Sequence, residues 1–253
     1  MSRPAGAASD QRPDLPIKPA ATVMLVRDAP AGLEVFVLRR VAAMAFAPGM
    51  TVFPGGAVDP ADHDPALHWT GPDVAWWAQH LQQEVALARA LVVAAVRELF
   101  EETGVLLAGP IGADSPAPEQ LDDEVRVGLI EHRITLASAL AAAGLQLRAD
   151  LLRPWANWIT PPGRTKRYDT FFFAAALPTG QQAEMLTTEA DLGQWRTPQE
   201  LFDEGAAGTT ALMPPTMAML TDLAGCANVA QVLAAQRVVT PVRVRAGDFP
   251  GIG

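Results

Sequence analysis

The sequence lacks the features of a disulfide-rich protein and of a membrane-spanning one. Its 253 residues include a single cysteine, Cys226, which excludes an internal disulfide framework and is typical of a reducing compartment. The nearest approach to a long apolar run, LARALVVAAV (87–96), is well short of the roughly 20 residues that cross a bilayer. The opening residues have no apolar signal core. We therefore expect a flexible leader over 1–19, a cytoplasmic location and no membrane partner.

Lysine is also scarce, and acidic residues outnumber basic ones. Lys18 and Lys166 are the two lysines among 19 basic residues, against 28 acidic residues, which gives a formal net charge of −9. A general nucleic-acid binder needs a basic surface, so the composition argues against a nucleic-acid partner. An acidic protein can still bind a phosphorylated small molecule when a metal cation lies between the two.

The order of local patterns predicts one α+β domain. β-rich runs around a turn at Asp28–Gly32 predict a hairpin over 21–40, and proline and glycine residues divide 45–64 into loops and a short strand. Further strands are expected at 155–161 and 168–177, with the polar loop PPGRTKR between them. Helices are expected at 73–81, at 84–103, at two places within 119–144, after the capping box Thr197–Glu200 and after Pro215. We assign the domain to 20–245 and a C-terminal tail to 246–253.

The helix expected at 84–103 carries three glutamates near its C-terminal end, in the stretch AAVRELFEETG (94–104). With 3.6 residues per turn, Glu101 and Glu102 lie about 60° and about 40° to either side of Glu98, so the three side chains share one face. Apolar residues occupy the opposite face, and Gly104 stands where a C-terminal cap belongs. The helix is therefore amphipathic, with a polar face of one charge sign.

This clustering of carboxylates is unfavourable in an isolated helix. Like charges three or four positions apart repel by roughly 0.2–0.5 kcal/mol per pair, and the helix dipole disfavours anions at the C-terminal end by about 0.3–1 kcal/mol. A helix face in solvent tolerates both penalties. A divalent cation reverses them, because Mg²⁺ and Mn²⁺ prefer oxygen ligands gathered on one side. On geometry alone, both interpretations stay open.

Two segments around the glutamates resemble the signature of the Nudix hydrolase family. VFPGG (52–56) precedes the helix, and RELFEETGV (97–105) ends it with the family's pattern of Arg-Glu-apolar-x-Glu-Glu-x-Gly-apolar. The resemblance implies a Nudix-type α/β/α sandwich with a mixed sheet. It also implies an enzyme that hydrolyses a diphosphate linkage, with Mg²⁺ or Mn²⁺ as cofactor and a nucleotide-type small molecule as substrate.

The same resemblance assigns catalytic roles within the motif. Glu98, Glu101 and Glu102 are expected to be metal ligands, although any one of them could instead help to deprotonate water. Arg97 is expected to orient these glutamates through a bidentate contact, and the alternative is a surface ion pair of little value. Glu189 resembles a later acidic position that serves some Nudix enzymes as an extra ligand or base, and the alternative is a solvated loop carboxylate.

The first half of the motif departs from the family pattern. Arg97 follows Gly56 by 41 positions, about 27 more than the pattern has, which indicates a helical insertion at about 63–89 before the catalytic helix. Asp62 also stands where the pattern has a glutamate. The insertion contains three tryptophans and is either a structural appendage that packs those rings or a wall over the substrate. We expect some contact with the substrate.

One branch of the family, the peroxisomal-type coenzyme A diphosphatases, also has an interrupted motif. FAPGMTVFPGG (46–56) and LMPPTMAMLTDL (212–223) are similar to segments of that branch, whereas Ala45 stands where the coenzyme A signature has an arginine. The resemblance implies hydrolysis of coenzyme A or acyl-coenzyme A to a phosphopantetheine product and adenosine 3′,5′-bisphosphate. ADP-ribose or a nucleotide sugar is the alternative substrate, and a catalytically silent nucleotide-binding module is the alternative class.

Further residues are expected to contact the substrate. The cluster Arg164, Lys166 and Arg167 either binds phosphate or is a solvated loop, and a homodimer is compatible with the sequence. The full set expected to bind substrate is Arg40, Phe53, Gly55, Gly56, Arg164, Lys166 and Arg167.

Overall fold

The computed structural model describes residues 16–41, 48–112 and 121–243. Most of the predicted leader, the whole predicted tail and Ala45 lie outside these residues. The first strand begins at Lys18, within the last two residues of the span predicted as leader. Among the described residues, no helix combines the length and the apolar composition of a bilayer-spanning segment.

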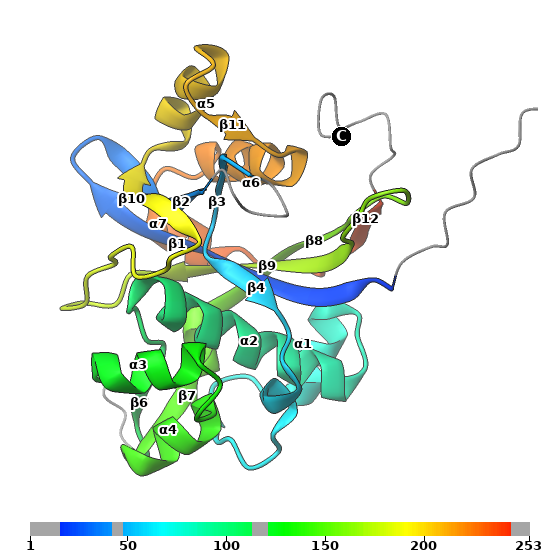
Figure 1. Ribbon diagram of the computed structural model, residues 1–253, viewed down its shortest axis with the longest axis vertical. Coiled ribbons are helices and arrows are strands. Elements are labelled where there is room, and N and C mark those ends of the chain that lie inside the picture. Colours follow the sequence, from blue (N-terminus) through cyan, green and yellow to red (C-terminus); the bar gives the residue numbers. More distant parts are fainter. Residues whose placement is uncertain (1–15, 42–47, 113–120, 244–253) are drawn as a thin grey trace, which may run out of the picture.

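A mixed sheet forms the centre of the described structure (Figure 1). Strand β1 (Lys18–Ala29) pairs antiparallel with β2 (Gly32–Arg40), which confirms the predicted hairpin, and parallel with β9 (Tyr168–Ala176). The order is β11-β3-β2-β1-β9-β8-β12, while β10 pairs with β2 and β4 pairs with β1. The other strands of this sheet are β3 (Met50–Val52), β4 (Gly55–Ala57), β8 (Leu152–Ile159), β10 (Ala190–Arg196), β11 (Ala211–Leu212) and β12 (Pro241–Arg243).

Helices cover both faces of the sheet, because its strands bury side chains on both sides. Along β1, Val23 and Leu25 belong to the core around α2, while Met24 and Val26 belong to the core around α6 and α7. Helices α1–α4 lie on the first face and α5–α7 on the second (Figure 1). The predicted α/β/α sandwich is therefore confirmed. The helices are α1 (Val74–Leu81), α2 (Val85–Thr103), α3 (Asp123–Ile130), α4 (Leu136–Ala142), α5 (Pro198–Ala206), α6 (Pro214–Ala224) and α7 (Val229–Ala234), with 3₁₀ turns at Pro60–His63 and Ala149–Leu151.

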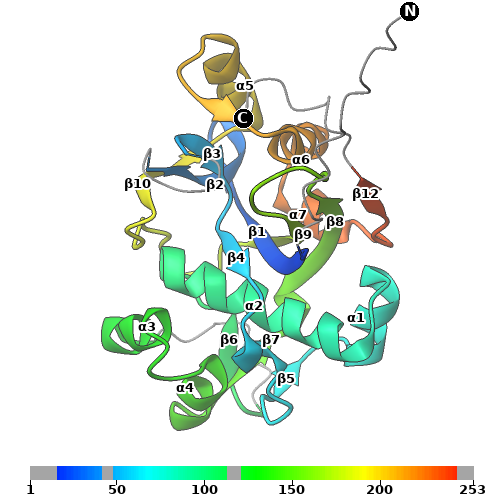
Figure 2. The same cartoon turned by 45° about the vertical axis from the view of Figure 1, so that its right-hand side comes forward.

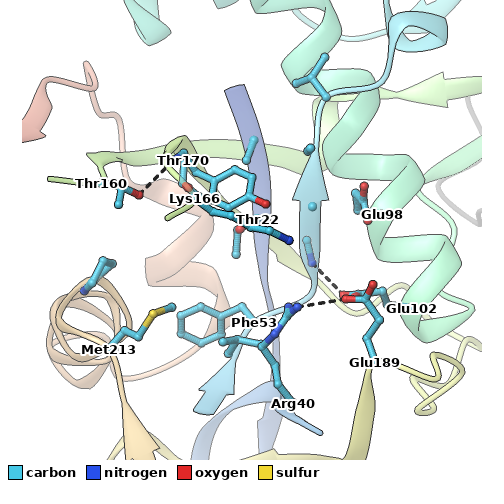
Figure 3. A pocket seen from close by; sticks show the side chains of 18 of the residues that line it. Thr22, Arg40, Phe53, Glu98, Glu102, Thr160, Lys166, Thr170, Glu189 and Met213 are labelled. Carbon is cyan, nitrogen blue, oxygen red and sulfur yellow. Dashed lines mark hydrogen bonds and ion pairs between the residues drawn. The ribbon is translucent and has the colours of Figure 1, made fainter. Parts of the chain in front are cut away.

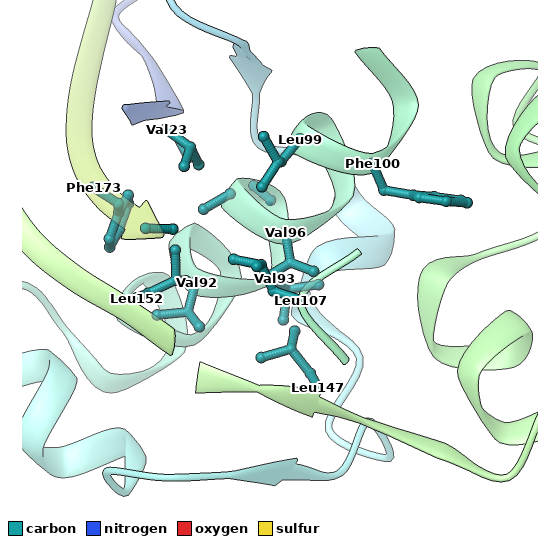
Figure 4. Packing of buried hydrophobic residues seen from close by; sticks show 14 of the residues in the cluster. Val23, Val92, Val93, Val96, Leu99, Phe100, Leu107, Leu147, Leu152 and Phe173 are labelled. Atoms are coloured by element: carbon teal, nitrogen blue, oxygen red, sulfur yellow. The ribbon is translucent and has the colours of Figure 1, made fainter. Parts of the chain in front are cut away.

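Helix α2 is the central helix of the first face, and its bounds and its left-handed cap at Gly104 agree with the prediction. Figure 4 shows Val92 and Val96 packed between Phe173 of the main sheet and Leu147 below the helix. Leu147 belongs to a smaller sheet, which lies under α2 in Figure 2. That sheet has the order β5-β7-β6 and consists of β5 (Trp69–Thr70), β6 (Ala108–Pro110) and β7 (Leu145–Arg148). Helix α2 therefore packs between the main sheet and the smaller sheet.

The predicted insertion forms β5, α1 and the first turn of α2. Its Trp77 is fully buried, and the ring centroid lies 6.0 Å from that of Phe173 on β9. Arg89 of α2 donates hydrogen bonds to the backbone carbonyls of Asp64, Pro65 and Leu67 and so ties the insertion to the helix. The insertion is therefore an integral part of the hydrophobic core.

Candidate active site

A cavity of about 1420 Å³ opens beside the C-terminal end of α2 (Figure 3). Its walls come from β1, from β4, from the loop between β8 and β9, from residues 186–189 and from the start of α6. Glu98, Glu101 and Glu102 all line this cavity. The acidic face of α2 therefore faces this cavity. The side chains of Glu98 and Glu101 are only 14% and 13% exposed.

Arg97 joins the two halves of the motif. Its Nε and Nη2 each donate to a different oxygen of Asp62 at 2.9 Å, a bidentate pair in which both side chains are buried. Nη1 donates to Glu98 at 2.8 Å and, more weakly, to Glu101 at 3.4 Å. Nη2 also donates to the carbonyl of Ala57 at 3.0 Å. A surface ion pair, the alternative interpretation of Arg97, is therefore wrong.

The two glycines of β4 allow this strand to approach the glutamates. The Gly55 N–H donates to Glu102 Oε2 at 2.9 Å, and a Cβ on Gly55 would overlap the carbonyl oxygen of Ala21. A Cβ on Gly56 would lie 2.5 Å from Glu98 Oε1. Glycine is required at both positions, because a side chain on Gly55 would clash with the backbone of β1 and a side chain on Gly56 would clash with Glu98.

The cavity wall raises the pKa values of all three glutamates. Loss of hydration raises the pKa of Glu102 to about 8, and the neighbouring charge of Glu98 adds to the effect, while the bond from Gly55 opposes it. Loss of hydration likewise raises the pKa of Glu98 to about 7, against the opposing pull of Arg97. The pKa of Glu101 is raised for the same first reason. Without a cation, this wall holds its negative charge at a cost in free energy.

Comparisons with known proteins identify the family of this chain. The sequence model of the NUDT19 Nudix domain matches residues 72–223. The chain belongs to the NUDT19 Nudix domain family. It is 30% identical to the acyl-coenzyme A diphosphatase NUDT19 of Gallus gallus, over 74% of the chain and 60% of that protein, and 29% identical to the Homo sapiens NUDT19, over 79% of the chain and 63% of that protein. The chain thus spans less than two thirds of these curated relatives.

A solved structure supports the same assignment. The crystal structure of a Nudix hydrolase from Alicyclobacillus acidocaldarius superposes with a TM-score of 0.74 at 29% identity, covering 88% of this chain and 98% of that one. The likeness to a Nudix hydrolase structure therefore extends beyond the residues 72–223 that the family model matches.

Nudix hydrolases generally use divalent metal ions, and the donor chemistry of the cavity wall fits such an ion. Three carboxylates lie on one wall. Lost hydration raises their pKa values, the charge of Glu101 adds to the effect at Glu98, and the charge of Glu98 adds to it at Glu102; a hard cation relieves this repulsion. As the side chains stand, no three Asp, Glu, His or Cys residues of the described chain are arranged around a common point. Glu98 and Glu101 are instead turned toward Arg97. A cation bound by all three carboxylates therefore requires these side chains to move closer together.

The other residues expected to bind substrate divide into two groups. Arg40, Phe53, Arg164 and Lys166 line the cavity, and Glu189 lies beside them, with its carboxylate 3.1 Å from Arg40 Nη2. Arg167 is buried outside the cavity lining, and its Nε donates to the Thr160 carbonyl at 3.3 Å. Arg167 is therefore not placed to contact a substrate in this cavity, unlike its neighbours Lys166 and Tyr168, which both line it.

The insertion does not reach the cavity. Its residues at 63–89 are all described, and none of them lines the space next to the glutamates. The expected contact between the insertion and the substrate is therefore wrong. Trp77 of α1 is instead buried, with its ring centroid 6.0 Å from that of Phe173 on β9.

Several residues that line the Nudix cavity were not predicted. The unpredicted lining residues include Trp158, Phe172, Met213 and His132. Met213 precedes α6 as its N-cap and lines the cavity. The two-residue alternation of Thr170 and Phe172 along β9 is a signal that could have found part of this set.

Replacement of Gly56 by alanine tests the close approach of β4 to Glu98. Gly56→Ala should change the free energy of unfolding by less than about 1 kcal/mol, because a side-chain carboxylate can move aside. It should weaken Mn²⁺ binding, measured by titration calorimetry, by about 10-fold or more, because Glu98 is displaced. Gly205→Ala, whose Cβ would make only an ordinary 3.6 Å contact with Leu212, is the control. Unchanged Mn²⁺ affinity in Gly56→Ala would refute the steric argument.

The raised pKa values predict how stability depends on pH in metal-free protein. A carboxyl whose pKa rises from 4.5 in the unfolded chain to about 8 at Glu102 binds its proton more tightly when folded. Its stabilisation is complete below pH 4.5 and is lost as the pH rises through 8. Chemical denaturation with a chelator should therefore show that Glu102→Gln is more stable than wild type at pH 8.5, by on the order of 2–4 kcal/mol, with little difference at pH 5. Glu84→Gln, at the exposed start of α2, should follow wild type. If the stability of Glu102→Gln depended on pH as that of wild type does, the raised pKa of Glu102 would be contradicted.

Proposed function

We propose that this protein is a divalent-metal-dependent hydrolase that cleaves the diphosphate of coenzyme A or acyl-coenzyme A. The products would be a phosphopantetheine or acyl-phosphopantetheine and adenosine 3′,5′-bisphosphate. The observation that carries the proposal is a wall of three glutamates that faces a large cavity, with two of them held by Arg97 and the third by the Gly55 N–H. A purely nucleotide-binding module would have no need to keep three carboxylates together at raised pKa.

Glu98, Glu101 and Glu102 would hold the metal, with Mg²⁺ or Mn²⁺ favoured by all-oxygen ligands. When bound, the cation supplies Lewis-acid activation of the diphosphate and lowers the pKa of water. Arg97 keeps two of the carboxylates on the cavity side while its own charge is neutralised by Asp62. The Gly55 N–H orients the third, Glu102.

Glu189 is proposed to accept the proton of the attacking water. It lies in the same cavity as the three glutamates, and its negative charge contributes to the raised pKa of Glu102. Arg40 holds the Glu189 carboxylate at 3.1 Å and so limits its position. The hydrolysis adds the water oxygen to phosphorus, breaks the bridging P–O bond and leaves each product with a terminal phosphate.

The rest of the cavity fits a long substrate with an apolar arm. Its volume of about 1420 Å³ exceeds the roughly 300–1,000 Å³ of common ligand pockets. Phe53, Phe172, Trp158 and Met213 supply an apolar wall away from the carboxylates, and Phe53 and Met213 face each other in Figure 3. The name of the NUDT19 relatives, acyl-coenzyme A diphosphatase, agrees with such a substrate.

A substrate panel tests this proposal. Purified protein should hydrolyse coenzyme A or acyl-coenzyme A with Mg²⁺ or Mn²⁺ and lose activity with a chelator. Glu101→Gln should lower kcat by about 100- to 1,000-fold, as loss of a preorganised charge-stabilising group does elsewhere, while Glu84→Gln should keep wild-type activity. A clear preference for ADP-ribose or a nucleotide sugar would refute the substrate, and no metal-dependent turnover of any diphosphate would refute the enzyme.

A further inference from the structure

The loop between β8 and β9 forms the cavity wall that faces the glutamates. Residues 160–166 of this loop all line the cavity. Two backbone-anchored contacts close its base: the Thr160 N–H donates to the Tyr168 carbonyl at 2.9 Å, and the Tyr168 N–H donates to Thr160 Oγ1 at 3.0 Å. Arg167 adds a third tie through the Thr160 carbonyl. These hydrogen bonds hold the two ends of the loop together, and the residues between them line the cavity.

Adjacent basic residues of this loop have opposite orientations. Arg167 is buried and outside the cavity lining, whereas Lys166 lines the cavity. Figure 3 shows the Lys166 side chain extended from the loop into the cavity, toward the side on which Glu98 and Glu102 lie. Arg167 therefore fixes the loop, and Lys166 carries positive charge into the space where a substrate would sit.

Acidic side chains outnumber basic ones around the cavity, which disfavours an anionic substrate unless a cation contacts it. Asp59, Glu98, Glu101, Glu102 and Glu189 line the cavity, and all are acidic. Of the basic side chains that line the cavity, Arg40 and Arg97 are already paired with carboxylates, and Arg164 and Lys166 both belong to the loop between β8 and β9. Lys166 forms an ion pair with no acidic side chain of the described chain.

We propose that Lys166 binds a phosphate group of the substrate from the wall opposite the glutamates. A lysine ammonium is a compact charge with three donors, which suits a phosphate oxygen that can be approached from several directions. The inference rests on the proposed function, because it takes the substrate to be a diphosphate. In coenzyme A this phosphate is either part of the diphosphate itself or the phosphate on the ribose.

Steady-state kinetics with two substrates test the proposal and distinguish the two phosphates. Lys166→Gln should raise KM for coenzyme A by about 10- to 100-fold, the range of a charge-assisted hydrogen bond, with kcat less affected because the contact exists before the reaction. Lys166→Arg should recover part of the loss. If KM rises equally for dephospho-coenzyme A, Lys166 binds the diphosphate, and if the rise is confined to coenzyme A, it binds the ribose phosphate.

The chain offers a matched control in its other lysine. Lys18 is exposed at the start of β1 and does not line the cavity, so Lys18→Gln removes the same charge from elsewhere. It should leave KM within about two-fold of wild type, because exposed charges at a distance are screened by salt. Unchanged KM in Lys166→Gln, or an equal change in Lys18→Gln, would overturn the proposal.

A binding measurement separates this inference from the proposed function. Titration calorimetry of metal-free protein with adenosine 3′,5′-bisphosphate and with adenosine 5′-diphosphate requires no turnover. At least one of these ligands should bind wild type about 10-fold more tightly than Lys166→Gln. That result would support the phosphate contact even if coenzyme A were not hydrolysed, whereas equal affinities, or no binding to wild type, would overturn it.

Discussion

The bidentate pair between Arg97 and Asp62 is the contact on which the site depends. Both side chains are buried, so each charge is tolerable only because the other compensates it. From this fixed position, Arg97 reaches Glu98, Glu101 and the carbonyl of Ala57. One guanidinium therefore sets both the place of β4 and the orientation of two proposed metal ligands.

This pair also explains how the chain tolerates an insertion inside its catalytic motif. Asp62 and Arg97 are 35 positions apart in sequence, yet they close the motif in space. Asp62 lies in the 3₁₀ turn that ends at His63, and Arg97 lies in α2, so the insertion connects this turn to the helix. Since Trp77 anchors the insertion in the core beside Phe173, the insertion lengthens α2 and stabilises its position without entering the cavity.

The features that could be predicted from sequence are those with local causes. Helical periodicity and a glycine cap define α2, and the capping box at Thr197 defines the start of α5. The shared face of the three glutamates follows from helix geometry alone. The parallel pairing of β1 with β9 and the strand β10 were not predicted, because both depend on partners far away in the chain. The opposite orientations of Lys166 and Arg167 were not predicted either, because they depend on the hydrogen bonds that join the two ends of the loop.

Metal affinity of an Asp62→Asn protein tests the central claim most directly. The change removes the charge that holds Arg97, and Asp64→Asn makes the same change two positions away, outside the network. If Asp62 orients the carboxylates through Arg97, the Kd for Mn²⁺, measured by electron paramagnetic resonance on folded protein, should rise by about 10- to 100-fold in Asp62→Asn and stay unchanged in Asp64→Asn. Wild-type Mn²⁺ affinity in folded Asp62→Asn would contradict the account.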